Sequence, residues 1–537
     1  MVRTRPAVLQ RLKIFLLVCA IGLVAACSGG GGGGSTSGST PQGPPQKGGT
    51  LAIALNAEPA TLDWSSTTAV VTRAVAWNIF EQLFAYDKDY KVRPLLATGY
   101  KVSADKLTYT ITLRDGVKFH DGSTMTPADV IASIKRWGEI SGTGGKVAAY
   151  IAGMTAKGSN AVEIKLKQPF APLIPCLAEV RQAAVIMPAK IANAAGKNKL
   201  STAQLIGTGP YKFVNWSPGQ NVTLERFADY SSRSEDWGGL TGAKHAYLDK
   251  LEYDFVKDSQ VRVNGVQTGQ YQFAVNVPQD LYDQVKTIDT VQPFIVKPYA
   301  WQAFVFNKAA APFNDVRLRQ AVEYASNLQD LASAGVGNKA FYQIDPSIFF
   351  PESSLHSLQG TEQYNVQNVA KAKQLMSAAH YDGKPIRILT TKDYPEFYNG
   401  AVALASQLEA VGFKTEIQVY DWATVLQRRD DKALYEIFTT TNSPSFDPTS
   451  TDWMVPQASP GFYTSPKMDG LLKQWAGATD EATKQKLLAE FNQTVYSEVP
   501  LIKGAVLSAL YVGSKSLQGY PNWLDTTFWN AWLPTGG

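Results

Sequence analysis

The four histidines of this chain are the side chains best suited to acid–base or zinc chemistry, and their spacing argues against both. They are far apart, with no pair at a helical or zinc-ligand interval: His120, His245, His356 and His380. The Gly-x-Ser-x-Gly turn that carries the nucleophile of many hydrolases is absent. His120 follows Lys118-Phe119 beside a turn, where a structural role explains it better than catalysis. The sequence therefore predicts no catalytic residue, no metal site and no cofactor.

The segment Gly207–Tyr211 has the glycines of a phosphate-binding loop but lacks the rest of its chemistry. It reads Gly-Thr-Gly-Pro-Tyr, without the Gly-Lys-Ser/Thr ending, and Pro210 removes one backbone donor. Acidic residues are plentiful, yet sequence alone does not pair them into an acid and a base. An extracytoplasmic hydrolase therefore stays open as an alternative.

The first 26 residues are typical of an export signal. A basic segment without acidic residues precedes an apolar run of 13 residues, Ile14–Ala26, which is too short for an ordinary spanning helix. The run ends in Leu-Val-Ala-Ala-Cys27, which resembles the lipobox of bacterial lipoproteins. We expect removal of residues 1–26 as a signal peptide and lipidation of Cys27, which would anchor the chain to a membrane outside the cytoplasm. An ordinary signal peptide with a chance cysteine is the alternative.

Residues 27–48 are predicted to form a flexible tether. Beyond Cys27 they are almost all Gly, Ser, Thr, Pro and Gln, a composition that cannot bury apolar surface. Treated as a flexible coil, the segment spans roughly 25 Å. Ser28 is not the aspartate that retains many lipoproteins at the inner membrane of Gram-negative bacteria. The destination, in the periplasm or at the cell surface, therefore stays open.

The rest of the chain has the composition of a large globular protein. The 537 residues are 45% hydrophobic and allow two or three lobes. The formal charge of +5 includes four positive charges of the predicted signal, so the mature chain is close to neutral. Because no basic cluster interleaved with aromatic residues occurs, nucleic acid is not expected as a partner. Cys176, without a disulfide partner in the mature chain, is predicted to be a buried apolar thiol.

The hydrophobic pattern predicts a β-rich early region and a later α/β region. Expected early elements are the strands Thr50–Leu55, Tyr109–Leu113 and Ala161–Leu166, a helical stretch through Ala74–Phe84, and a helix that opens with Thr126 as N-cap. Later the chain reads as strand Ile386–Thr390, helix Phe397–Val411 and strand Lys414–Val419. This order implies a parallel sheet with a right-handed crossover.

Several blocks of sequence resemble the family 5 solute-binding proteins, which are the oligopeptide-, dipeptide- and nickel-binding lipoproteins that serve ABC importers. The blocks occur in the family's order from about residue 47 to the end of the chain. They are Lys47–Leu51, Ala57–Asp63, Ile79–Phe84, Leu113–Gly122 with Ala128–Val130, Ile206–Phe213 and Pro312–Ala321.

The resemblance implies an α/β, two-lobed periplasmic-binding-protein-like fold of type II (cluster C-like), with a β-rich extra domain inserted in the first lobe. By similarity lobe I takes residues 49–80, 197–297 and 509–537, the insertion 81–196 and lobe II 298–508. It also implies a monomer that closes over a small organic solute, performs no reaction and delivers the solute to the permease of an ABC importer. A nickel-chelate receptor of the same family and a scaffold lipoprotein are the alternatives.

The same resemblance places the solute pocket along the stretch from Trp422 to Pro448, whose spacing matches the family without a gap. It implies that Trp422 is a ligand-contacting ring, that Arg429 is a cation of the cleft, and that a polar strand end faces the solute: Thr441, Asn442 and Ser443. Trp301 and Tyr394 are further aromatic candidates. Packing in a core is the ordinary alternative for large aromatic residues.

Two positions depart from the family pattern. Where peptide-binding members carry an aspartate for the ammonium end of the ligand, this chain has Pro444. A buried ammonium without a counter-charge is costly, so free peptides are expected to bind weakly or only with unusual contacts. Thr268–Phe273 is the second departure, and we have no physical account of it.

Overall fold

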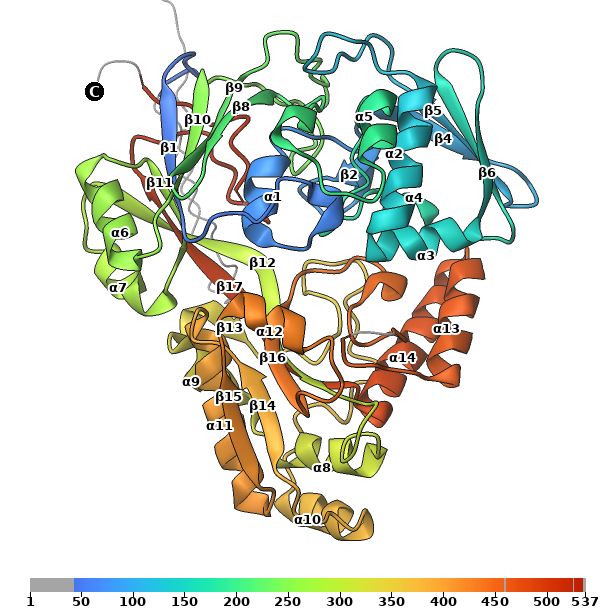
Figure 1. Cartoon of the computed structure of the whole chain (residues 1–537), viewed down its shortest axis with the longest axis vertical. Helices are drawn as coiled ribbons and strands as arrows, with labels where there is room; N and C mark the ends of the chain where they lie inside the picture. The colour runs from blue at the N-terminus through green and yellow to red at the C-terminus, as the bar shows by residue number, and fades with distance from the viewer. Residues whose placement is uncertain (1–42, 458–459, 525, 535–537) are drawn as a thin grey trace, which may run out of the picture. The chain divides into compact units, whose positions relative to one another are not determined.

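One eleven-stranded mixed sheet organises the fold (Figure 1). This computed structural model describes residues 43–457, 460–524 and 526–534, so the predicted signal peptide, the predicted lipidation site Cys27 and the tether up to residue 42 lie outside the described residues. The strand order is β15-β14-β16-β12-β17-β11-β1-β10-β9-β8, with β13 paired to β17. The strands are β1 Thr50–Leu55, β8 Tyr211–Ser217, β9 Asn221–Arg226, β10 Lys250–Phe255, β11 Phe273–Val277, β12 Val291–Phe306, β13 Tyr342–Gln343, β14 Ile386–Thr390, β15 Thr415–Val419, β16 Ile437–Asn442 and β17 Leu501–Ser514.

Two long antiparallel strands, β12 and β17, join two separate hydrophobic cores. One half of the β12–β17 pair, with Phe294 and Tyr511, belongs to a core formed mainly by residues before 297 and after 508. The other half, with Phe304 and Ile502, belongs to a core formed by residues 301–506. The register of the pair breaks between Val296 and Ala300. The main chain thus passes from one core to the other through these paired strands.

The predicted strand–helix–strand unit is confirmed. β14 and β15 pair in parallel and are connected by helix α11, Pro395–Val411, which ends at Gly412 in a left-handed conformation. The other helices around this core are α8 Val316–Ala325, α9 Leu328–Val336, α10 Val369–Ala378, α12 Trp422–Arg428, α13 Pro466–Gly477 and α14 Glu481–Glu498. Figure 1 shows β14 to β16 and α8 to α11 together in the lower part of the view.

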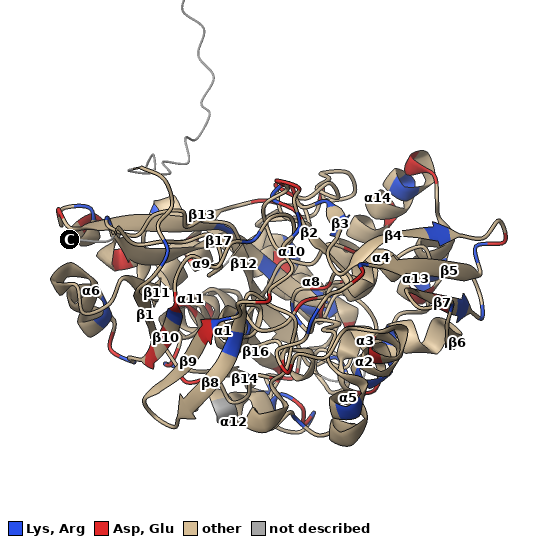
Figure 2. Ribbon diagram, turned by 90° about the horizontal axis from the view of Figure 1, so that it is seen from above, with Lys and Arg blue, Asp and Glu red and all other residues tan. Residues whose placement is uncertain are grey.

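Residues 81–196 hold an antiparallel sheet of their own and several helices. The strand order of this sheet is β4-β5-β7-β6. In Figures 1 and 2 the sheet lies on the right, whereas β8, β9 and β10 lie on the left. Its strands are β4 Ala97–Val102, β5 Thr108–Leu113, β6 Ile151–Ala156 and β7 Ala161–Leu166, preceded by the hairpin β2 Phe84–Tyr86 and β3 Val92–Pro94. The helices are α2 Pro127–Ile140, α3 Gly142–Tyr150, α4 Leu173–Leu177 and α5 Ala189–Ala195. The predicted N-cap of α2 is confirmed, since Thr126 and Asp129 form a capping box.

The predicted helical stretch through Ala74–Phe84 is wrong over most of its length. Helix α1, Val70–Ala76, ends early because the next carbonyl groups bind elsewhere. The Ile79 carbonyl accepts a hydrogen bond from the Gly209 backbone at 2.9 Å, and a Cβ at Gly207 would lie 2.1 Å from that same oxygen. The glycines of the 207–211 segment therefore serve this close backbone contact.

His120 fixes the same glycine segment from the other side. Its Nε2–H donates to the Gly209 carbonyl at 2.9 Å, while its Nδ1 accepts from the Gly207 backbone at 3.3 Å. Both ring nitrogens are therefore occupied only in the neutral tautomer. Burial lowers the pKa of His120 to about 4, which keeps the ring neutral near pH 7.

Buried ion pairs hold further sequence blocks in place. Asp63 pairs with Arg136 at 2.6 Å, and both side chains are essentially excluded from solvent. Glu81 binds the Lys244 ammonium at 3.0 Å and accepts hydrogen bonds from Tyr230 and Thr208. Because each charge has partners, these groups stabilise local geometry and are not available to a ligand.

Helices α6, Ser259–Thr268, and α7, Tyr282–Val285, pack in a third hydrophobic cluster, which also includes Val336 of α9. Cys176 in α4 is buried, and burial raises the pKa of its thiol, which confirms the predicted apolar environment. Within the described residues, every helix falls short of the length and apolar character needed to cross a bilayer.

Candidate functional site

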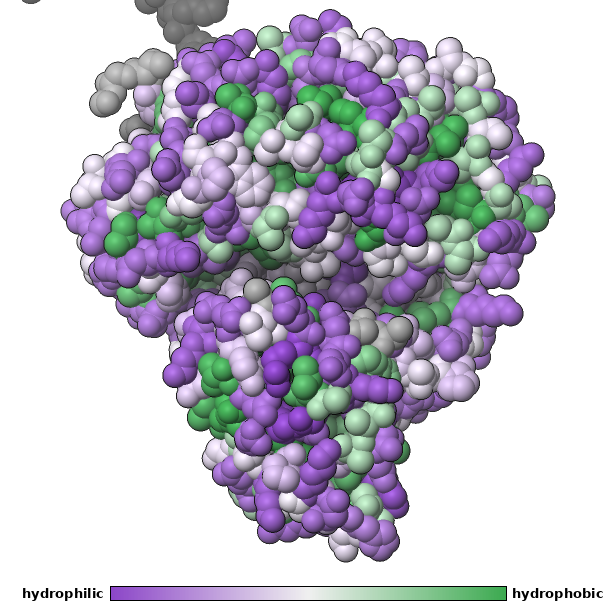
Figure 3. Space-filling model, viewed as in Figure 1, coloured by the Kyte–Doolittle hydropathy of each residue, from purple (hydrophilic) through white to green (hydrophobic). Residues whose placement is uncertain are grey.

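A cavity of about 650 Å³ lies where the two parts of the structure meet. Its first wall consists of Asn56, residues 66–71 (the start of α1 with the residues before it), Gly142, Thr143 and Lys146 of α3, Arg181, Gln182 and Asn276. Its second wall consists of Tyr299, Tyr394, Glu396, Phe397, the face of α12, Asp430, residues 440–443, and Asp452, Trp453, Gln457 and Pro460. Figure 3 shows the surface hollowed between these two sets of elements.

Helix α12 presents one face to the cavity. Trp422, Leu426 and Arg429 follow one another at intervals of four and three residues, which places them on the same side of a helix. The helix begins at Asp421, whose carboxylate accepts a hydrogen bond from the Thr424 backbone. The structure thus brings the predicted residues Trp422 and Arg429 into one lining surface.

Three aromatic rings and one carboxylate form a corner of the second wall, which we call the aromatic corner: Tyr394, Glu396, Phe397 and Trp422. The rings of Tyr394 and Trp422 meet edge to face, with centroids 5.4 Å apart, and the ring of Phe397 lies 5.5 Å from that of Trp422. Tyr394 and Phe397 stack at 4.9 Å because they are three residues apart at the start of α11. The predicted residue Tyr394 therefore belongs to the site.

The polar end of β16 contributes a further part of the cavity lining. Thr441, Asn442 and Ser443, all predicted from the sequence, line the cavity together with Thr440. The side-chain nitrogen of Asn442 is buried and has no hydrogen-bond partner among the described residues. Because an unsatisfied buried donor costs free energy, this amide is suited to bind an acceptor on a solute.

Arg429 is a cation without a counter-ion in the described structure. Its Nε has no hydrogen-bond partner there, and its side chain passes over the Phe438 ring. Burial lowers the pKa of Arg429, although Asp430 and Asp452 act against this shift from a distance. A guanidinium held in this way can bind a carboxylate through two parallel hydrogen bonds.

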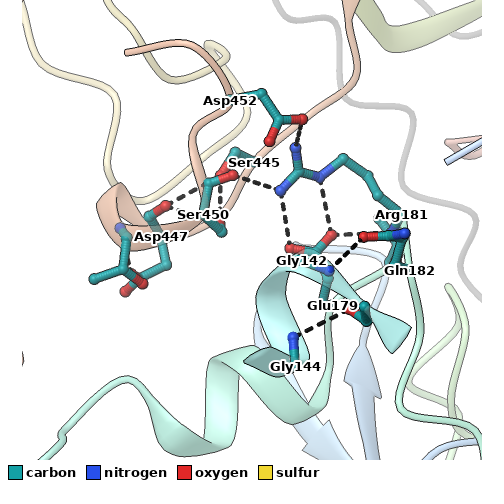
Figure 4. Close-up of polar contacts among 12 residues, drawn as sticks. Gly142, Gly144, Glu179, Arg181, Gln182, Ser445, Asp447, Ser450 and Asp452 are labelled. Carbon is teal, nitrogen blue, oxygen red and sulfur yellow. Dashed lines mark hydrogen bonds and ion pairs between the residues drawn. The ribbon is translucent and has the colours of Figure 1, made fainter. Parts of the chain in front are cut away.

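Arg181 is a second arginine of the cavity, and its charge is fully paired (Figure 4). Its guanidinium binds Glu179 on its own side, while Nη1 donates to Asp452 at 2.5 Å and Nη2 donates to the Ser450 carbonyl at 2.5 Å. Burial lowers the pKa of Arg181, but Asp452 and Glu179 more than offset this, so the pKa is raised. Arg181 thereby joins the first wall of the cavity to the second.

Two residues singled out in the sequence lie outside this cavity. Trp301 on β12 is 2% exposed and belongs to the hydrophobic core, so the structure does not bring it to the lining surface. Pro444 is buried and is not a lining residue either. The aromatic lining comes instead from the aromatic corner, Tyr299 and Trp453.

The sequence reasoning missed five charged lining residues: Lys146, Arg181, Glu396, Asp430 and Asp452. The Glu-Val-Arg sequence at 179–181 follows a long apolar run, and this signal could have indicated a buried ion pair. Glu396 carries no such signal, because an acid in the first turn of a helix is ordinarily a solvated residue. Its position in the cavity follows from the packing of α11 and could not be predicted from spacing.

A second and larger cavity, of about 770 Å³, lies between β4, β5 and the loop that joins α13 to α14. It is lined mostly by apolar side chains, among them Phe84, Tyr100 and Phe170, and it contains none of the residues predicted from the sequence. Neither cavity holds a metal-binding cluster, since the described residues contain no group of three or more His, Cys, Asp and Glu side chains placed to hold a metal ion.

Comparison with known proteins decides the family. Residues 91–462 match the description "Bacterial extracellular solute-binding proteins, family 5 Middle". The chain belongs to this family. It is therefore an extracytoplasmic solute-binding protein and not an enzyme, which confirms the family resemblance and decides against the hydrolase alternative.

The relatives of this family 5 protein differ in the solutes they are named for. The chain is 29% identical over 481 residues to "Probable peptide ABC transporter periplasmic-binding protein y4tO" of Sinorhizobium fredii, covering 86% of this chain and 89% of the relative. It is 29% identical to "Glutathione-binding protein GsiB" of Salmonella typhi, covering 89% and 93%. The solved structure of AgaA from A. tumefaciens R10 in complex with agropinic acid has the same fold, with a TM-score of 0.78 and 24% identity over 91% of this chain and 99% of that one.

Proposed function

We propose that this protein is the lipid-anchored substrate-binding component of an ABC importer, and that it captures a peptide-like or other small organic solute in the 650 Å³ cavity. The observation that carries the proposal is Arg429, a cavity-lining guanidinium without a counter-ion among the described residues. The Arg429 side chain is half-buried and forms no ion pair with the described residues, so a solute that supplies an anion compensates for its partial desolvation. The peptide ABC transporter relative supports the same assignment.

The solute is proposed to be anionic or neutral, and peptide-sized or smaller. Arg429 would bind its carboxylate, or a carbonyl if it is neutral, while Asn442 and Ser443 would supply hydrogen bonds and Trp422 would cover an apolar part. Glutathione and agropinic acid, for which two relatives are named, are suitable test solutes. No observation favours the nickel-chelate alternative.

Free di- to pentapeptides are proposed to bind weakly or only through unusual contacts. Pro444 offers no charge where peptide-binding members of the family carry an aspartate, and it lies outside the cavity lining. Titration calorimetry with Met-Leu and its N-acetylated form tests this point. Weak binding of free Met-Leu is expected, and tight binding that acetylation abolishes would contradict the Pro444 argument.

Capture is proposed to depend on closure of the two walls. We keep the lobe boundaries 49–80, 197–297 and 509–537 for lobe I, 81–196 for the insertion and 298–508 for lobe II, supported by the two cores that β12 and β17 connect. In this division Arg181 belongs to the insertion, and its partners Asp452 and Ser450 belong to lobe II. The ion pair would therefore form only when the two walls approach each other.

Small-angle scattering tests this function directly. The monomeric protein should become more compact when an extract of growth medium is added, and the bound solute should be recovered chemically unchanged. An unaltered scattering profile with every extract fraction, or recovery of converted products, would contradict the proposal.

Membrane anchoring through Cys27 is a separate part of the proposal. Replacing Cys27 by Ser removes the proposed acylation point, so the variant should move from the membrane to the soluble extracytoplasmic fraction. Replacing the neighbouring Ser28 by Ala is the matched control and should leave the protein at the membrane. Unchanged membrane association of the Cys27→Ser variant would refute lipidation at this residue.

A further inference from the structure

The aromatic corner contains a carboxylate for which the described structure supplies no counter-charge. Glu396 lines the cavity in the first turn of α11. No lysine, arginine or histidine of the described residues lies within ion-pair distance of it. The Glu396 side chain is half-buried, and this desolvation raises the pKa of its carboxyl.

The rings around Glu396 favour a particular kind of partner. Tyr394, Phe397 and Trp422 lie within 4.9 to 5.5 Å of one another, measured between ring centroids, and all three line the same cavity as the carboxylate. The negative charge of Glu396 reaches Tyr394, since it is one of the causes that raise the Tyr394 pKa to about 12, after burial. Aromatic faces and a carboxylate both attract a cation, and a substituted ammonium also buries apolar surface against the rings.

The same cavity therefore contains two charges of opposite sign that form no ion pair with the described residues. Arg429 and Glu396 form no ion pair with each other, so a single solute with an anion and a cation at different positions could satisfy both. The position at which the family resemblance places an ammonium-binding aspartate is Pro444, which does not line the cavity. The counter-charge for a cation of the solute would thus come from Glu396 at the start of α11.

We propose that Glu396 and the rings of Tyr394, Phe397 and Trp422 form a binding site for a substituted ammonium group, so that the protein selects solutes that carry this cation together with an anion for Arg429. This inference rests on the proposed function as a solute receptor. It assigns Glu396 as a specificity-determining residue.

A graded series of ω-amino acids tests the proposal, because their two ends carry the required charges at increasing separations. Ligand-observed NMR titration compares each ω-amino acid with the simple carboxylate of the same length, which lacks the ammonium. At least one ω-amino acid should bind the wild-type protein about tenfold more tightly than its carboxylate counterpart. If no member of the series shows this preference, the proposal is wrong.

Glu396→Gln is the decisive variant, since it keeps the size of the side chain and removes only the charge. It should abolish the preference for the ammonium, whereas Glu409→Gln, at an exposed position of the same helix, should retain it. An undiminished preference in Glu396→Gln would overturn the proposal. Circular dichroism of both variants establishes that they fold, and Glu396→Gln leaves no other described side chain without a partner.

Failure of this inference can be distinguished from failure of the proposed function. If only the inference is wrong, the protein still retains a solute from its host and still becomes compact with extract, while the ω-amino acids bind no better than the carboxylates. If the receptor function is wrong, scattering with growth-medium extract also shows no change.

Discussion

Charged side chains near the sequence blocks that identify the family are paired with opposite charges. In the cavity, by contrast, two charged side chains form no ion pair with the described residues. Around the blocks, Asp63 pairs with Arg136 and Glu81 binds Lys244, so each buried charge is matched within the protein. In the cavity, Arg429 and Glu396 are left unmatched by the described residues. Matched charges fix the fold, whereas unmatched charges are available to a solute. Arg181 combines both features, because it lines the cavity while its charge is paired with opposite charges of the protein.

Breaking a matched pair should produce the largest loss of stability. Arg136→Met leaves Asp63 buried with a single backbone donor at Leu200, so the free energy of unfolding should fall by about 3–5 kcal/mol. Urea denaturation measures this as a lower midpoint without a change in slope.

The control for this variant removes both charges. The double variant Asp63→Leu with Arg136→Met should recover part of the loss, because no uncompensated charge then remains. A loss below about 1 kcal/mol in the single variant would show that the pair does not fix the fold.

Arg181→Met should affect both stability and solute capture, which distinguishes it from the other arginines. Glu179 stays buried without its partner, while Asp452 is 37% exposed and can be hydrated, so we expect a loss of about 2–3 kcal/mol. When extract is added, small-angle scattering should also show a smaller compaction for this variant than for the wild-type protein. Normal compaction together with reduced stability would show that the pair has no part in closure.

The burial of His120 should make stability depend on pH. The folded-state pKa of about 4 lies below the ordinary value of 6.5, so the unfolded chain binds more protons between these values. This contribution to stability is fully present above pH 6.5 and is lost as the pH falls towards 4. It should amount to about 3 kcal/mol.

His120→Gln tests the pH prediction, since an amide can still donate to Gly209 and accept from Gly207 without titrating. The difference between the unfolding free energies of wild type and variant should change between pH 6.5 and 4 and be constant above that range. A constant difference over the whole range would refute the assignment.

Removing the charge of Arg429 should have the smallest effect on stability and the clearest effect on solute binding. Arg429→Gln should change the free energy of unfolding by less than about 0.5 kcal/mol, because it loses the contact with the Phe438 ring but no described ion pair. Binding of an anionic solute should weaken by about 10- to 100-fold, the value of a charged hydrogen-bond pair. Arg428→Gln is the matched control, since Arg428 lies over the Tyr420 ring, with its guanidinium carbon 4.3 Å from the ring centroid, and does not line the cavity.

The sequence predicted most of the regular elements because their signals are local. Alternation gave strands such as β7, and the Thr-Pro-Ala-Asp sequence at 126–129 gave the start of α2. The stretch 74–84 was mispredicted, since its helix ends where backbone carbonyls bind a glycine segment about 130 residues later. Such a contact leaves no signal in local propensity.

The candidate site was predictable where it follows one continuous stretch. Trp422, Arg429 and residues 441–443 lie on α12 and β16, which are close in sequence, so the family spacing was informative. Trp301 was predicted because it follows residues 297–300 at the approach to the second lobe, where family members line the cleft, but it packs into the core as most large aromatic residues do. Glu396 and Arg181 reach the cavity through tertiary packing, which spacing does not report.

Native mass spectrometry of the protein purified from its own host tests the central claim most directly, namely that unmatched charges of the cavity hold the solute. The wild-type protein and Arg428→Gln should each retain one small organic solute with an anionic group, which is released unchanged on denaturation. Arg429→Gln should retain it weakly or not at all. Equal retention by Arg429→Gln and wild type would contradict the account.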